Sequence, residues 1–128
     1  MANNARKLQI DEGNSRMEPD ILHAAMCGDI DEAKAALQEF PLSYKRTGNY
    51  NQSVLQIAMQ NFHKEFGLYI LNNTEISTRG KDAFGKDALD TALVCSNNEL
   101  GEAIWLKWNE ERSLELFGEK PPLFTPQP

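Results

Sequence analysis

The sequence predicts an all-α fold in which three helix-turn-helix repeats stack on one another. The first observation is a pattern of apolar residues that recurs at a spacing of 34. Ala24, Ala58 and Ala92 keep this spacing, as do Ile21, Leu55 and Leu89, and as do Ala36, Ile70 and Ile104. The second observation is that each copy holds two apolar runs separated by an acidic residue, which is Asp31, Glu65 or Glu99. A period between about 20 and 50 residues indicates a stacked array whose neighbouring repeats share one core.

The first pair of helices follows from residues that begin and end helices. A helix is expected over about 19–27, with Pro19 in its first turn and Gly28 at its end. Asp29 can cap a second helix over about 30–39, and Pro41 ends it.

The other two pairs follow from the same spacing. Helices are expected near 53–61 and 63–72 in the second copy, and near 87–95 and 97–117 in the third, with Gly118 ending the last one. This last helix is longer than its counterparts, and Leu100, Ile104 and Trp108 recur along it as an apolar stripe. Because the outer face of a stack has no neighbour, the lengthened helix is expected to act as a cap.

The third copy carries the most detailed motif. Residues 82–92 read Asp-Ala-Phe-Gly-Lys-Asp-Ala-Leu-Asp-Thr-Ala. This segment resembles the start of an ankyrin repeat, Asp-x-x-Gly-x-Thr-Pro-Leu-His-x-Ala, with Asp87, Ala88 and Asp90 replacing Thr, Pro and His. The resemblance covers about residues 14–108. It implies an ankyrin-repeat solenoid of three helix-turn-helix repeats with a lengthened C-terminal capping helix.

The chain is expected to divide into three parts. Residues 1–18 hold few large apolar side chains and are expected to be a partly flexible N-terminal extension. Residues 19–117 are expected to be the repeat domain, with repeats at about 14–47, 48–81 and 82–117. Residues 118–128 are rich in proline and are expected to form a flexible tail.

Composition and charge narrow the function classes. The chain is 41% hydrophobic and 25% charged, which are ordinary values for a globular protein. Thirteen basic against nineteen acidic residues give a net charge of -6, which argues against nucleic acid as a partner. No apolar run approaches the length of a membrane span, and the polar N-terminus lacks a secretory signal. A cytoplasmic location is therefore expected, with Cys27 and Cys95 as reduced thiols.

The resemblance also implies a binding surface. Ankyrin repeats usually grip a protein partner with the turn tips before each first helix and with the exposed, concave face of that helix. The matching positions here are Met26, Cys27, Asn49, Tyr50, Gln52, Gln60, Asn61, Ala83, Phe84, Lys86, Val94 and Cys95. Tyr50 and Phe84 are 34 apart, so they occupy one turn-tip position in successive repeats, and aromatic residues are enriched at binding hot spots. Trp105 is a further candidate, at the end of the array.

We therefore expect a non-catalytic protein-binding module that needs no cofactor, metal or small-molecule substrate. Two other hypotheses compete with this one. His23 and Cys27 are four apart on one helix, with Asp20 and Asp31 nearby, and could form a nucleophilic site or half a zinc site. Separately, Glu110, Glu111, Glu115 and Glu119 followed by Leu123 and Phe124 are similar to the glutamate-rich C-terminal export signals of effectors that intracellular bacteria inject into host cells. The second hypothesis predicts an exported inhibitor of a host protein.

Overall fold

The computed structural model describes residues 18–96 and 98–118, and within these ranges the regular structure is helical, with no strand. The helices are α1 (Ile21–Cys27), α2 (Ile30–Glu39), α3 (Val54–Gln60), α4 (Lys64–Asn73), α5 (Ala88–Cys95) and α6 (Glu99–Phe117). Two short 3-10 turns, η1 (Ser43–Lys45) and η2 (Asn49–Asn51), lie between α2 and α3. The prediction of an all-α fold is confirmed. The extension before residue 18 and the tail after residue 118 lie outside the described residues.

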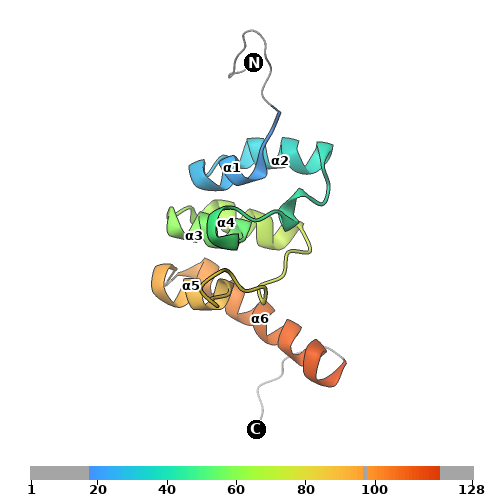
Figure 1. Ribbon diagram of the computed structural model, residues 1–128, viewed down its shortest axis with the longest axis vertical. Coiled ribbons are helices and arrows are strands. Elements are labelled where there is room, and N and C mark those ends of the chain that lie inside the picture. Colours follow the sequence, from blue (N-terminus) through green and yellow to red (C-terminus); the bar gives the residue numbers. More distant parts are fainter. Residues whose placement is uncertain (1–17, 97, 119–128) are drawn as a thin grey trace.

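The six helices form three hairpins that stack one upon the next. Figure 1 shows the hairpins α1–α2, α3–α4 and α5–α6 arranged in order along the longest axis of the molecule, with α6 running past the others at one end. Between hairpins, α3 packs against both α1 and α5, and α4 packs against α6. The chief contacts therefore join hairpins that are neighbours in sequence.

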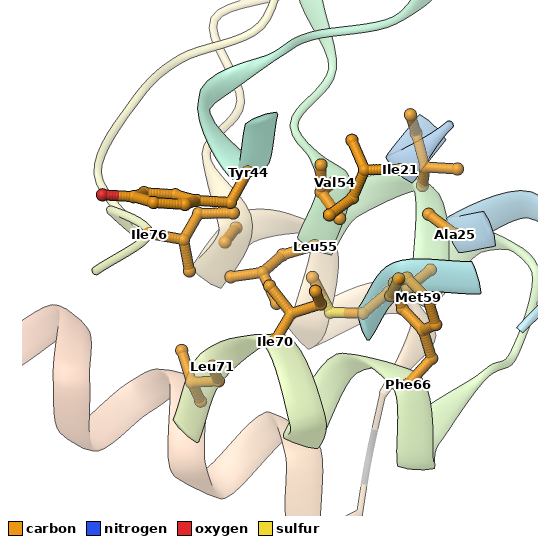
Figure 2. Packing of buried hydrophobic residues seen from close by; sticks show 14 of the residues in the cluster. Ile21, Ala25, Tyr44, Val54, Leu55, Met59, Phe66, Ile70, Leu71 and Ile76 are labelled. Atoms are coloured by element: carbon orange, nitrogen blue, oxygen red, sulfur yellow. The ribbon is translucent and has the colours of Figure 1, made fainter. Parts of the chain in front are cut away.

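The core is made by the recurring apolar positions. Ala24, Ala58 and Ala92 are buried, as are Ile21, Leu55, Ala36, Ile70 and Ile104. Figure 2 shows Leu55, Met59 and Ile70 of the second hairpin pointing toward one another, with Phe66 beside Met59. Leu89 differs from its counterparts Ile21 and Leu55, because it is only half-buried. It belongs to the last hairpin, which has a packed neighbour on one side only in the described chain.

The helix ends lie within two residues of the expected ones, and the largest differences are at the starts of α1 and α6. Asp29 caps α2 by accepting from the Glu32 amide at 3.0 Å, and Gly28 ends α1 with a left-handed backbone, φ 73°. Pro19, however, lies outside α1. The cap is Asp20, whose carboxylate accepts from the Leu22 amide at 2.9 Å, so the helix begins at Ile21, two residues after the expected start at Pro19.

The second half of α6 does something other than cover the end of the stack. The Trp108 indole donates to Asp87 at 2.9 Å, and the Glu111 carboxylate accepts from the Thr78 amide at 3.0 Å. Arg79 lies over the Trp108 ring at 4.6 Å and donates to Glu115 at 2.6 Å. The second half of α6 therefore contacts the connection between α4 and α5, whereas we expected it to cap the outer face of the stack.

Candidate partner-binding surface

Two connecting turns of the chain are built alike. In the turn before α3, the Gly48 amide donates to the Gln52 carbonyl at 2.9 Å, and in the turn before α5 the Asp82 amide donates to the Lys86 carbonyl at 2.8 Å. Donor and acceptor are 34 residues apart between the two turns in both cases. Each turn therefore projects its tip in the same way from successive hairpins.

Tyr50 and Phe84 stand at these two tips and contact each other. Their ring centroids are 5.2 Å apart with the rings tilted by 41°, a separation typical of an attractive aromatic pair. Both side chains are nonetheless largely open to solvent, at 64% and 63% exposure. The pair is a small aromatic strip that the molecule does not use to fill its core.

Hydrogen bonds between the turns hold the strip in place. The Ala83 amide donates to the Tyr50 carbonyl at 2.8 Å, and the Asn51 side chain donates to the Lys81 carbonyl at 3.3 Å. Tyr50 and Asn51 both have left-handed backbones, with φ 59° and 60°. Such a conformation costs of order 1 kcal/mol or more for a residue with a Cβ, and it persists because the surrounding bonds fix it. Hydrogen bonds therefore fix the backbone at this tip while both rings stay exposed.

Gln56 supports this arrangement from the buried side, and the sequence analysis did not single it out. Its buried side chain donates to the Asp82 carboxylate at 3.2 Å, the Lys86 carbonyl at 3.2 Å and the Thr91 hydroxyl at 3.0 Å. The only signal in the sequence is its place three residues after Ser53, and that pattern predicts a capping box alone. The bonds to residues 26 to 35 positions away depend on the stacking.

Asp82 shapes the second turn electrostatically. Its carboxylate accepts from the Lys86 amide at 2.9 Å and from the Phe84 amide at 2.8 Å. The Lys86 amide is the main reason that the pKa of Asp82 lies below its ordinary value, while burial acts in the opposite direction. A charged Asp82 therefore orders the backbone on both sides of the Phe84 ring.

The remaining predicted residues lie beside this strip or along the first helices. Asn49, Ala83 and Lys86 are exposed on the two turns, and Gln52 is half-buried. Met26, Gln60 and Val94 occupy one equivalent position in α1, α3 and α5, and all three are exposed; Cys27 and Asn61 are exposed at the next position, and Cys95 is half-buried. Most of the predicted side chains are therefore exposed, and the structure brings Tyr50 and Phe84 into contact.

Trp105 belongs to a different surface. It lines an open groove between α5 and α6 together with Leu89, Ala92 and Leu93, and neither Tyr50 nor Phe84 lines that groove. Trp105 is 53% exposed.

His23 and Cys27 approach each other at the surface of α1. Cys27 Sγ lies 3.6 Å from His23 Nε2, and His23 Nδ1 lies 2.8 Å from the Glu32 carboxylate. The hydrogen bond with Glu32 is the main reason that the pKa of His23 is raised. The carboxylate beside His23 is thus Glu32, whereas Asp20 caps α1 and pairs with Arg46 at 3.2 Å. The side chains of His23 and Cys27 are both exposed, and neither lines any of the grooves described for this chain.

Both Cys27 and Cys95 are free thiols. Within residues 18–96 and 98–118, no three His, Cys, Asp or Glu side chains gather in a way that could hold a metal ion.

The glutamates of the proposed export signal are partly engaged in the fold. Glu111 accepts from Ser77 and Thr78, and Glu115 accepts from Arg79. Glu119, Leu123 and Phe124 lie outside the described residues. Two members of the pattern therefore have a structural role.

Comparison with known proteins gives no family. No protein-family model matches the chain. No curated protein matches it either. Of the helices described for the chain, none combines the length and the apolar character that a membrane crossing requires.

Proposed function

We propose that this chain is an ankyrin-type module that binds a protein partner without catalysis, through the aromatic strip formed by Tyr50 and Phe84. The observation that carries the proposal is that two rings 5.2 Å apart are more than half exposed while their backbones are fixed by hydrogen bonds. Rings that only covered their own turns would be expected to lose most of their accessible surface. A preordered aromatic surface also loses little conformational entropy on binding.

The ankyrin assignment within this proposal is supported by bonding as well as by burial. The turn hydrogen bonds recur 34 residues apart, and so do the capping boxes at Ser53 and Asp87. The buried alanines at positions 24, 58 and 92 recur at the same spacing. A shared register of turns, caps and core is the behaviour expected of true repeats.

The surroundings of the strip indicate the kind of partner surface it fits. Lys81 and Lys86 are exposed on the same turn as Phe84, and Asn49 is exposed beside Tyr50. Interfaces commonly place such polar side chains around an apolar centre. The proposed partner therefore offers an apolar pocket for the two rings, with acidic groups at its rim.

The experiment compares proteins captured from the native cell lysate by the wild-type chain and by a Tyr50→Ala, Phe84→Ala double variant. For each protein captured, the affinities of the two single variants are then measured. Each truncation is expected to weaken binding by about 2 kcal/mol or more if the ring is a hot spot. The thermal midpoint should change little, because both rings are exposed.

Phe62→Ala is the matched control. Phe62 is also an exposed aromatic residue with a left-handed backbone, φ 62°, but it lies between α3 and α4. Proteins bound by the wild type and by Phe62→Ala but lost by the double variant would support the strip. If the double variant retained every partner at wild-type affinity, the strip would not be the binding surface.

The competing effector hypothesis uses the same surface and differs only in export. Glu111 and Glu115 already have partners on the connection between α4 and α5. No feature of the described residues favours export over a role in the cell that makes the protein. We therefore propose the binding module without export.

A further inference from the structure

The outer face of the third hairpin carries apolar residues at the same repeat positions that pack between neighbouring hairpins inside the stack. Ala25, Met59 and Leu93 are 34 apart, and the first two are fully buried whereas Leu93 is 75% exposed. Leu71 and Trp105 form a second such pair, in which Leu71 is buried and Trp105 is half-exposed. The last hairpin therefore presents an apolar layer that nothing in the described chain covers.

The opposite end of the stack is polar. Glu32 occupies the position of Phe66 and Leu100, both of which are buried against a neighbouring hairpin. The Glu32 carboxylate accepts from the Asp20 amide at 3.1 Å and lies 2.8 Å from His23 Nδ1. A second molecule stacked head to tail would bury this paired group against Leu93 and Trp105, which is costly. The apolar face thus does not fit the first hairpin of another copy.

The apolar face does fit itself, because one stripe of α6 is self-complementary. Glu102, Trp105, Asn109 and Arg112 follow one another at spacings of three, four and three, so they share one side of the helix. When two copies of α6 run antiparallel, Glu102 of each lies opposite Arg112 of the other. Glu102 and Arg112 are both exposed, and neither has an ion-pair partner among the described residues.

We propose that the outer face of α5 and α6 is the interface of a two-fold symmetric dimer of this chain, with the α6 helices crossing antiparallel near Lys107. Packed helices cross at angles of about 20–50°. Such a crossing carries Leu116, which is 55% exposed, from the partner helix toward Leu93 on α5. A two-fold contact uses the same patch on both copies and closes at two subunits, so it leads to no filament.

The test is sedimentation of the purified full chain over a wide concentration range. The wild type is expected to sediment as a dimer. Glu102→Arg alone and Arg112→Glu alone each turn two attractions into repulsions and should raise the dissociation constant roughly ten-fold. The double exchange, Glu102→Arg with Arg112→Glu, should restore dimerisation because it recreates both pairs.

A second variant tests the apolar part of the face. Leu93→Glu should give a monomer with unchanged helix content by circular dichroism, since the side chain is exposed in the single chain. Met26→Glu is the matched control, because Met26 is an apolar residue of α1 at 54% exposure, and it should remain dimeric.

Three outcomes would overturn the dimer. The first is a wild type that stays monomeric at the highest concentration that remains in solution. The second is a dimer that Leu93→Glu does not dissociate. The third is a double exchange that fails to restore the dimerisation weakened by the single exchanges. That result would rule out the antiparallel pairing of Glu102 with Arg112. A monomeric wild type whose melting point drops in Leu93→Glu would assign the face to another segment of the same chain. The dimer does not depend on the Tyr50 and Phe84 strip.

Discussion

Gln56 is the side chain that ties the second hairpin to the third. Replacing it with Leu keeps much of its volume but removes the donor for the Asp82 carboxylate, the Lys86 carbonyl and the Thr91 hydroxyl. A buried polar group left without its partner costs about 1–3 kcal/mol. We expect Gln56→Leu to lower the free energy of unfolding by about 2 kcal/mol in urea titration.

Gln60→Leu is the control for this change, because Gln60 lies on the same helix with its side chain in solvent. It should alter the free energy of unfolding by less than about 0.5 kcal/mol. Equal effects at the two positions would mean that the buried network adds no stability.

His23 makes the stability of the first hairpin depend on pH. The hydrogen bond with Glu32 raises the pKa of His23, so protons are held more tightly in the folded chain than in the unfolded one. The stabilisation is fully present below the unfolded pKa of about 6.5 and is lost as the pH rises through the folded value. Because the side chain is half-exposed, the effect should amount to about a few tenths of a kcal/mol.

The measurement is the urea midpoint at about pH 6 and about pH 8 for the wild type and for His23→Gln. The wild type should lose more stability than the variant between the two values. A variant with the same slope as the wild type would show that another group is responsible.

At the scale of the element, the second half of α6 stabilises the connection between α4 and α5. A chain that ends at Leu106 loses the Trp108 bond to Asp87, the Glu111 bonds to Ser77 and Thr78 and the Arg79 contacts. With the apolar area of Trp108 included, we expect a loss of about 2–4 kcal/mol. Thermal melting should fall, and amide exchange should rise first around Thr78.

A chain that ends at Gly118 is the matched comparison, because it keeps every one of these contacts. It should melt close to the full chain. If the chain ending at Leu106 did so as well, the contacts on Trp108, Glu111 and Glu115 would be incidental to folding.

At the scale of the whole molecule, the repeat of apolar residues was enough to predict the helices. The buried alanines at positions 24, 58 and 92 lie on the faces that pack, and every predicted helix end lies within two residues of the observed one. The two-residue difference at the start of α1 reflects a competition between Pro19 and Asp20 for the first position of the helix. Asp20 caps the helix because its carboxylate accepts hydrogen bonds from the free amide groups of the first turn. A proline merely lacks an amide hydrogen of its own and satisfies no other.

The candidate surface was predictable only as a set of positions. The spacing placed Tyr50 and Phe84 on equivalent turns, but their contact depends on the distance between hairpins and on the left-handed backbone of Tyr50. The bonds of Gln56 and the exposure of Leu93 likewise arise between hairpins. Periodicity within the sequence contains no direct measure of these distances.

The stacking of hairpins that are neighbours in sequence also has a consequence for how fast the protein reaches its structure. The contacts of α1 with α3, of α3 with α5 and of α4 with α6 each close a loop of only about one repeat. Proteins dominated by such short-range contacts fold in microseconds to milliseconds, because little chain entropy is lost before contacts form. The search for the native state can therefore begin at any one hairpin pair and spread to the next along the chain.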